Sequence, residues 1–400
     1  MADMDSRCGW DSRNMTAADV VIIGAGIVGL SSGYWLAKAG AKVIVLEKGR
    51  VGWEASSRAT GFLSLRGEQP LESPLAAEAE RIWQTLDAEL GSPTEWRPGG
   101  RLWAAVTQDE WIELQDTYKL FTETGIPFRL IDGKEARKIV PCLPDHVVGG
   151  IHTTRSGHAN PQRTIQAFAW AFQKHGGQIL ENTPAIGLIT KDGRMTGVKT
   201  PDGTIDTDTV VNCAGPQISL IADMVGVRVP VACARLEAMV TVPLPPLFDV
   251  AMVAHGLSLR QTRRGNIHFN GGPHEWVDVS LTAEPAKPNT PIIRNMARRL
   301  AELFPSLANA QVLRSWAGIV EMTPDVNCII ERLAEPQGLI IASTSGHGFG
   351  MAPSVGLAIS ELALNGKTNL PIASLGLARF AKLAPDWKAR RRWEAGDYNT

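Results

Sequence analysis

The chain has 400 residues, with 40 Lys and Arg against 41 Asp and Glu, which gives a formal net charge of −1 at pH 7. This balance excludes the strong global field by which basic proteins attract nucleic acid or a membrane surface. The length allows two domains or one large interleaved domain. The five cysteines are dispersed and have no metal-site spacing, which predicts a reducing compartment and no metal centre.

Residues 1–18 are polar and contain no apolar segment of the kind found in secretory signals, so we expect a disordered leader. The uncharged run from Val20 to Ala37 is long enough to cross a bilayer. Its four glycines and its place in the motif described next instead favour a soluble, cytoplasmic protein that binds no membrane.

The segment from Asp19 to Glu47 has the pattern of a dinucleotide-binding unit. The β-branched run "DVVIIG" predicts a buried strand, the loop Gly24-Ala25-Gly26-Ile27-Val28-Gly29 follows, and "LSSGYWLAKAG" has helical spacing. A second strand, "KVIVLE", ends at Glu47. In such a unit Gly24 permits the tight turn, Gly26 leaves room for a pyrophosphate, and Gly29 lets the helix approach the strand. Glu47 accepts hydrogen bonds from a ribose diol.

The fingerprint by itself leaves NAD and FAD open, because both carry the same ADP moiety. Regular alternation of strand and helix stops after Glu47, where a loop of small and polar residues could approach another part of a ligand. Short strands with Gly and Asp-Gly turns follow and end in "TVVNCAG", whose Ala214-Gly215 pair offers no side-chain obstruction. Near the C-terminus, "GLIIASTSGHGFGMAPSVG" repeats the pattern of a strand that ends in a glycine loop and a helix.

Taken together, the GAGIVG loop with Glu47, the "VVNCAG" strand, "WAGIVEMTPD" and "SGHGFGMAPSVG" resemble the D-amino-acid oxidase superfamily of flavoproteins. Within it, the likeness is to sarcosine and glycine oxidases and to the flavin-bearing β subunits of sarcosine, proline and opine dehydrogenases. The resemblance implies an α/β fold of the glutathione-reductase type, in which a Rossmann-like FAD-binding domain is interleaved with an antiparallel-sheet substrate domain.

The expected FAD-binding domain comprises residues 19–84, 150–228 and 312–372, and the expected substrate domain comprises 85–149 and 229–311. Residues 373–400 form a C-terminal extension. The substrate domain should contain a hairpin that turns at Arg264-Gly265-Asn266 and an amphipathic helix in "IIRNMARRLAELFP". A helix that begins near Pro353 should direct its N-terminus at the flavin, where its dipole would stabilise negative charge.

FAD should therefore extend from the first glycine loop to the second. The residues expected to bind it are Gly24, Gly26, Ile27, Val28, Gly29, Glu47, Lys48, Ser56, Ser57, Arg58, Ala59, Thr60, Ala214, Gly215, Gly318, Gly346, His347, Gly348, Phe349, Gly350 and Met351. Monomeric sarcosine oxidases attach flavin through a cysteine where this chain has Gly318, so we expect non-covalent FAD.

The expected catalytic candidates are His347 at the flavin loop, Arg260 and His268 on the hairpin, and Glu321. Each also has an ordinary structural interpretation, as do Glu237 and Arg66. Relatives bind a small substrate carboxylate through cationic residues at the positions of Val320 and Gly350. Arg260 is the proposed replacement, and the missing anchors favour a larger secondary amine, an opine or a cyclic imino acid over glycine or sarcosine.

The predicted activity is oxidation of a C–N bond by hydride transfer to flavin N5, which gives an imine that hydrolyses. Oxygen or another carrier would accept the electrons. Two alternatives stay open: an NAD-dependent oxidoreductase, and a flavin-carrying subunit that serves assembly or electron relay beside a heteromeric partner.

Overall fold

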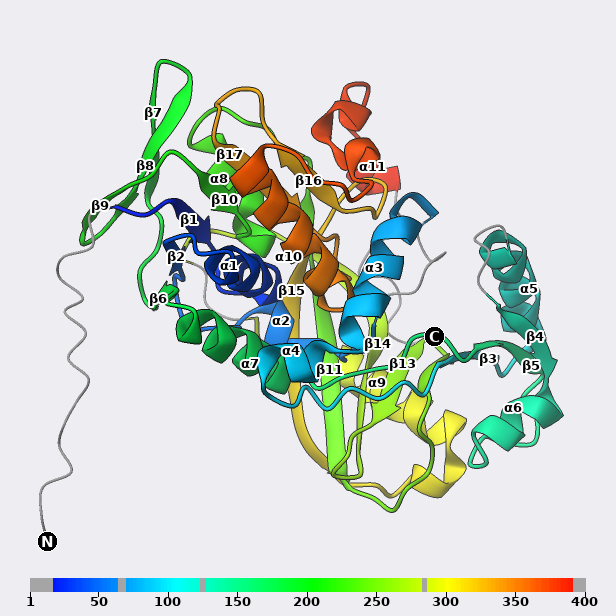
Figure 1. The fold of residues 1–400 in the computed structure, drawn as a ribbon. Helices are drawn as coiled ribbons and strands as arrows, with labels where there is room; N and C mark the ends of the chain where they lie inside the picture. The colour runs from blue at the N-terminus through cyan, green and yellow to red at the C-terminus, as the bar shows by residue number, and fades with distance from the viewer. Residues whose placement is uncertain (1–16, 64–69, 123–126, 283–285, 391–400) are drawn as a thin grey trace, which may run out of the picture.

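The computed structural model describes residues 17–63, 70–122, 127–282 and 286–390. Most of the predicted leader, Arg66 and the last ten residues lie outside these ranges. The strands form sheets of six, eight and three strands, and the two larger sheets lie side by side (Figure 1). In the part of the chain that is described, no helix has both the length and the apolar character needed to cross a membrane.

The six-stranded sheet contains the fingerprint. Its order is β16-β17-β10-β1-β2-β6, in which β17 through β6 run parallel and β16 is antiparallel. The strands are β1 (Val20–Ile23), β2 (Val43–Leu46), β6 (Gln178–Leu180), β10 (Val210–Asn212), β16 (Ile329–Arg332) and β17 (Leu339–Ser343). Strands β1, β2 and β10 are apolar and buried because both faces of this sheet are covered.

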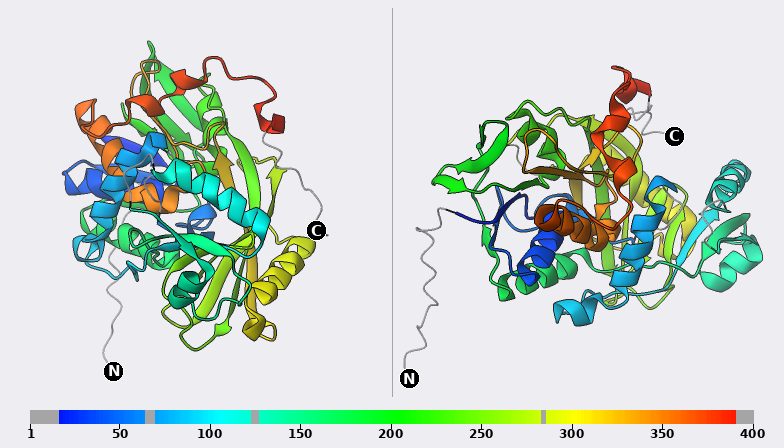
Figure 2. Two further views of the ribbon diagram at one scale, coloured as in Figure 1. Left: turned by 90° about the vertical axis from the view of Figure 1, so that its right-hand side faces the viewer. Right: turned by 45° about the horizontal axis from the view of Figure 1, so that its top comes forward.

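Alternate residues of β1 enter two different cores. Val20 and Ile22 pack with α1 (Ile27–Lys38), α3 (Ser73–Trp83), α7 (Pro161–Lys174) and α10 (Gly348–Asn365). Val21 and Ile23 pack against α8 (Ile218–Asp223) and the small sheet of β7 (Gly187–Lys191), β8 (Arg194–Thr200) and β9 (Gly203–Asp206). The result is three layers, with the helices on one side of the parallel sheet and the small sheet on the other (Figures 1 and 2).

The eight-stranded sheet has the order β15-β11-β14-β13-β12-β3-β5-β4. Its strands are β3 (Arg101–Ala105), β4 (Arg129–Asp132), β5 (Gly149–Thr153), β11 (Ala232–Pro243), β12 (Ala251–Ala254), β13 (Leu257–Gln261), β14 (Asn266–Val277) and β15 (Val312–Met322). All neighbours are antiparallel except β3 and β12. The predicted hairpin is confirmed, because β13 and β14 pair around a turn at residues 262–265.

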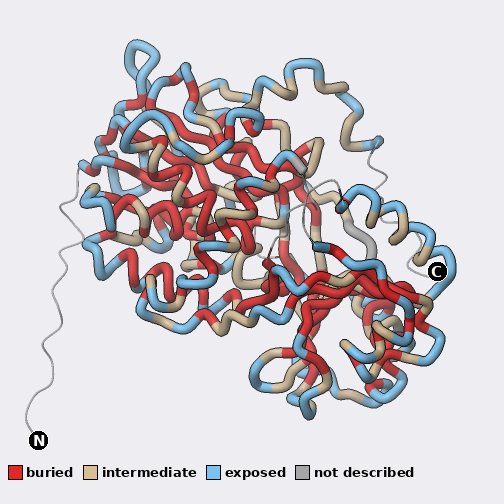
Figure 3. Tube along the Cα trace, turned by 45° about the vertical axis from the view of Figure 1, so that its right-hand side comes forward, coloured by how far each residue is buried: buried red, intermediate tan, exposed pale blue. Residues whose placement is uncertain are grey.

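Helices cover the face of this sheet that lies away from the parallel sheet. The predicted amphipathic helix is α9 (Thr290–Leu303), which packs with α6 (Gly133–Ile139) over Met239 and Phe269. Helix α5 (Gln108–Thr122) lies on the opposite face, the face that also carries Arg101, and covers Trp103 and Ile151 at the β3–β5 end. The remaining helices, α2 (Ala55–Arg58), α4 (Leu86–Leu90) and α11 (Trp387–Arg390), are short. Figure 3 shows the buried chain gathered in two regions that correspond to the two sheets.

The α/β fold and its interleaved sheets agree with the prediction, and two details differ from it. Strand β15 pairs along its whole length with β11, so residues 312–322 belong to the eight-stranded sheet although they were grouped with the FAD segments. Helix α10 begins at Gly348, ahead of Pro353. A proline is favoured in the first turn of a helix, but here the preceding glycines already have helical geometry.

Candidate active site

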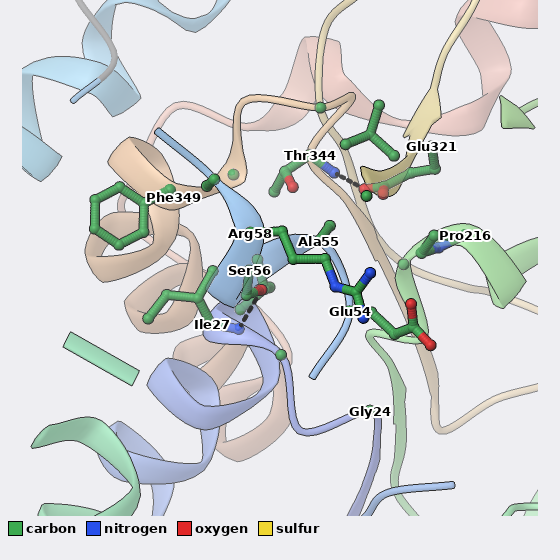
Figure 4. A pocket seen from close by; sticks show the side chains of 18 of the residues that line it. Gly24, Ile27, Glu54, Ala55, Ser56, Arg58, Pro216, Glu321, Thr344 and Phe349 are labelled. Atoms are coloured by element: carbon green, nitrogen blue, oxygen red, sulfur yellow. Dashed lines mark hydrogen bonds between the residues drawn. The ribbon is translucent and has the colours of Figure 1, made fainter. Parts of the chain in front are cut away.

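A cavity of about 430 Å³ lies between the two large sheets, and both glycine loops line it (Figure 4). Its wall includes Gly24, Gly26 and Glu47 from the first unit and Gly346–Phe349 from the second loop. The eight-stranded sheet supplies Gly318, Val320, Ser258 and Asn270. Segments that are far apart in the sequence therefore meet at one elongated site.

The glycines of the first loop have distinct roles. Gly24 has a φ of +105°, and a Cβ atom there would lie 2.5 Å from the carbonyl oxygen of Cys213. A Cβ atom at Gly29 would lie 2.0 Å from the carbonyl oxygen of Gly24. A Cβ atom at Gly26 would meet only the Ser56 hydroxyl, at 3.2 Å. Gly24 and Gly29 therefore serve backbone packing, whereas Gly26 keeps the cavity wall free of a side chain.

The acid at the end of β2 is fixed by the glycine loop. Glu47 Oε2 accepts a hydrogen bond from the Ala25 amide at 2.9 Å, and Oε1 accepts one from the Gly49 amide at 2.8 Å. Burial raises the pKa of this carboxyl group. At the start of α1, the Ile27 amide donates to Ser56 Oγ at 3.0 Å (Figure 4). These bonds fix the loop at the N-terminus of α1, the end of a helix that is suited to a phosphate group.

The second loop has the backbone that its glycines predict. Ser345 and Gly346 have φ values of +48° and +81°, and a Cβ atom at Gly348 would lie 2.1 Å from Thr344 Oγ1. Gly348 begins α10, whose first turn contains no acidic residue. The helix itself therefore places no carboxylate at its positive end, which faces the cavity.

Glu321 lines the cavity between these segments and is 6% exposed. Its Oε1 accepts hydrogen bonds from the Thr344 amide at 3.1 Å and from Ser343 Oγ at 3.3 Å. Burial raises its pKa. Because its neighbours Gly215 and Thr344 belong to the segments expected to bind the cofactor, its position favours a cofactor contact over a substrate contact.

Most of the predicted cofactor residues line the cavity, and four do not. Gly29 is engaged in packing as described above, and the Ser57 carbonyl accepts from Gln162 Nε2. Met351 is fully buried among the helices, and the carbonyl oxygen of Gly350 accepts from Trp83 Nε1 at 2.9 Å. Because α10 begins at Gly348, residues 350 and 351 already lie inside the helix.

The catalytic expectations for Arg260 and His268 need correction, because neither residue lines the cavity. Arg260 is 4% exposed and its Nε donates to the carbonyl oxygen of Thr60. Burial lowers its pKa to about 10. The ring of His268 is buried against Trp316, with centroids 5.1 Å apart. Both side chains therefore pack against residues next to the cavity and do not reach the cavity itself.

Glu237 borders the cavity, but its carboxyl group is held on the other face of the sheet. Alternation along β11 places its side chain on the same face as Met239, against α9. There its Oε1 accepts from the Asn289 amide at 3.2 Å and lies 3.1 Å from Arg235 Nε. Arg66 lies outside the described residues.

Arg101 is the pocket residue that sequence reasoning missed. It begins β3, is 4% exposed and lines the cavity. Its Nη2 donates to the Leu63 carbonyl at 2.6 Å, and its guanidinium carbon lies 4.8 Å from the centre of the Phe62 ring. Ser258 and Asn270, which pair across β13 and β14, lie on the same face of the sheet. A strand sequence such as "RLWAAV" does not by itself show which of its side chains faces a cavity.

His347 lines the cavity and contacts two residues that the sequence did not single out. Its Nε2 lies 2.7 Å from Glu72 Oε2 and 4.0 Å from Cys328 Sγ. Glu72 ends a short 3-10 helix, Pro70–Glu72, and is 3% exposed. Among the described residues this is the group whose ligand atoms lie close enough together to hold a metal ion.

The comparisons with known proteins agree with this geometry. The chain is 29% identical to sarcosine oxidase subunit beta of Rhodobacter capsulatus over 372 residues, which cover 90% of this chain and 88% of the relative. It is 27% identical to glycine oxidase of Geobacillus kaustophilus, with 90% and 97% covered.

Among solved structures, L-proline dehydrogenase from P. horikoshii superimposes with a TM-score of 0.83 at 29% identity, covering 92% of this chain and 98% of that one. Glycine oxidase from Geobacillus kaustophilus gives 0.85 at 24% identity, with 91% and 99% covered, which supports the fold. Residues 19–362 match the DAO family, described as FAD dependent oxidoreductase. This decides between the two dinucleotides in favour of FAD, and the chain belongs to the DAO family of FAD-dependent oxidoreductases.

Proposed function

We propose that this enzyme oxidises the C–N bond of an amino or imino acid, with a secondary amine, an opine or a cyclic imino acid as the favoured substrate class. The proposal rests on which segments the cavity connects. The cavity extends from the dinucleotide fingerprint to a polar end on the eight-stranded sheet, where Arg101, Ser258 and Asn270 lie. The names of the relatives, which act on sarcosine, glycine or proline, support the same class.

In this proposal the first glycine loop and Glu47 hold the ADP half of FAD, and Gly318 and the second loop hold the flavin half. The residues present fit such a ligand, because Gly26 presents no side chain and both helix N-termini face the cavity. Bound FAD supplies the hydride acceptor. The predicted domain division stays a proposal in which β15 joins the substrate sheet.

The residues at the sheet end orient the substrate and set its protonation state. A substrate carboxylate would pair with the buried Arg101, which fixes the α-carbon relative to the flavin half of the cavity. A cationic side chain in the cavity also lowers the pKa of a bound amine, because it disfavours a second positive charge nearby. The neutral amine is the form that can lose hydride.

At two positions where relatives have a cationic residue that binds the substrate carboxylate, this chain has an uncharged residue, which supports a larger substrate. Val320 lines the cavity where glycine-oxidase-like relatives have an arginine. Gly350, the position of a lysine in sarcosine oxidases, lies inside α10. With its anchor at Arg101 instead, the cavity would hold a substrate in a different orientation, so we expect glycine and sarcosine to react poorly.

Anaerobic mixing of the purified yellow protein with candidate amines tests the proposed function. We expect proline or an opine to bleach the flavin absorbance without any partner protein, and to do so faster than sarcosine or glycine. If no amine or amino acid bleaches the flavin, the proposal is wrong. The protein would then act as a flavin-carrying subunit, for which the similarity to sarcosine oxidase subunit beta gives independent support.

We further expect FAD to be bound without a covalent link. Gly318 offers no thiol, and burial raises the pKa of Cys213, a cysteine that lines the cavity, to about 12, so its thiol stays protonated. Both ring nitrogens of His347 already face acceptors. Acid precipitation should release the yellow cofactor into the supernatant. Colour that stays in the pellet would overturn this expectation.

The same proposal includes an electron acceptor, either oxygen or another carrier, and a heteromeric partner subunit. Stopped-flow reoxidation of the bleached protein by air separates an oxidase from a dehydrogenase that needs a carrier.

A further inference from the structure

The pair formed by His347 and Glu72 has a hydrogen-bond pattern that determines its charge. His347 Nδ1 lies 3.1 Å from the carbonyl oxygen of Ser345, and Nε2 lies 2.7 Å from Glu72 Oε2. A carbonyl oxygen can only accept, so Nδ1 carries a proton. Glu72 Oε1 accepts a hydrogen bond from the Cys328 amide, and Oε2 lies against His347 Nε2.

Two proton arrangements satisfy these contacts: an imidazolium with a carboxylate, or a neutral imidazole with a carboxylic acid. The first is favoured, because both carboxyl oxygens then accept and both ring nitrogens donate. The charge of His347 lowers the pKa of Glu72 in spite of its burial, which agrees with this choice.

A metal ion explains the cluster less well. The separation of 2.7 Å between Nε2 and Oε2 is that of a hydrogen bond, which leaves no room for an ion between them. Burial also raises the pKa of the Cys328 thiol well above its usual range, whereas a metal ligand must be a thiolate.

We propose that Glu72 is a positioning residue that keeps His347 as an imidazolium at the flavin end of the FAD site. The second loop contacts the eight-stranded sheet, since a Cβ atom at Gly346 would lie 3.6 Å from Val320. His347 therefore lines the cavity among the segments expected to hold the flavin half of the cofactor. Because His347 lines the cavity and Glu72 does not, the ion pair presents its positive end there, which favours the negatively charged reduced cofactor. This inference rests on FAD binding and is independent of the substrate.

Among the described residues, two further charged groups lie near this pair, Glu321 and Arg379. Glu321 on β15 interacts electrostatically with His347, and its own pKa is raised by burial. Arg379 donates to the carbonyl oxygen of Cys328 at 2.8 Å and pairs with Asp325. Cys328 carries a neutral thiol, as argued above. Within the described part of the chain, Glu72 is a carboxylate in direct contact with the imidazole.

The test is the midpoint potential of bound FAD in Glu72→Gln, measured by dye equilibration at several pH values. Gln keeps the shape but removes the counter-charge, so His347 should titrate near the ordinary histidine pKa of about 6.5. At pH 8.5 the imidazole is then neutral, and the ratio of reduced to oxidised flavin at a given potential should fall about tenfold. For a two-electron couple this is a decrease of about 30 mV. At pH 5.5 the potential should not lie below that of the wild type.

A substitution that merely distorts the loop would lower the potential equally at both pH values, and that result overturns the proposal. Glu78→Gln is the matched control, because Glu78 lies on the neighbouring α3 and pairs with Arg81 at the surface. Nitrogen NMR of histidine-labelled apoprotein gives a readout without flavin. Two protonated ring nitrogens at His347 at pH 8 support the imidazolium, and a neutral tautomer contradicts it.

Discussion

Gly26→Val should yield a folded protein that purifies without yellow colour. The new side chain would project from the first glycine loop toward Ser56 and into the space expected for the pyrophosphate. We expect FAD affinity to fall on the order of a thousandfold, which corresponds to about 4 kcal/mol. The free energy of unfolding of the apoprotein should change by about 1 kcal/mol or less, because the only close contact is a serine hydroxyl.

FAD titration by fluorescence quenching and urea unfolding of the apoproteins separate these two effects. Gly24→Ala is the informative contrast, because its Cβ atom would meet backbone at 2.5 Å at a φ of +105°. That variant should lose stability as well as cofactor. Gly187→Val on β7, where only the flexible Lys199 side chain is near, should stay yellow. A Gly26→Val protein with full flavin would show that the loop does not hold the pyrophosphate.

Arg101→Met should remove the proposed preference of the enzyme for acids over the corresponding amines. The methionine fills similar space between Phe62 and Trp103 but leaves a substrate carboxylate unpaired in a buried site. Breaking a buried charge pair costs about 2–5 kcal/mol, so kcat/KM for the acid should fall by roughly 30-fold to several thousandfold. For an amine that lacks only the carboxylate, such as pyrrolidine against proline, kcat/KM should change little.

Comparing the ratio of the two rate constants removes any general effect of the substitution on folding or flavin binding. Arg260→Met is the matched control, because Arg260 is equally buried but does not line the cavity. It should reduce thermal stability and leave the ratio unchanged. If Arg260→Met alters the ratio and Arg101→Met does not, the carboxylate site lies on the hairpin, as the sequence first suggested.

The parts of the fold that depend on local pattern were predictable. The fingerprint specifies a strand, a turn with φ values that need glycine, a helix and an acid, and the structure has each of them. The hairpin and α9 followed from turn residues and helical periodicity. The place of β15 could not be predicted, because its partner β11 is far away in the sequence and strand pairing is a long-range choice.

The substrate end of the site was the least predictable part. Arg101 and Arg260 are both arginines on buried strands, and what distinguishes them is which side chain reaches the cavity. Arg260 donates to Thr60 and Arg101 to Leu63, so both also support the loop that follows α2. Such partners are brought together by tertiary packing, as are His347 and Glu72, and no local spacing indicates them.

The order of strands in the parallel sheet also bears on when the protein can acquire its cofactor. Strand β1 pairs with β10, which pairs with β17, so the two glycine loops meet only after almost the whole chain exists. At roughly 5–20 residues per second, the first loop leaves the ribosome on the order of tens of seconds before the second. Nascent chains that end before β17 should therefore hold no flavin. A cell short of riboflavin would accumulate complete but colourless enzyme.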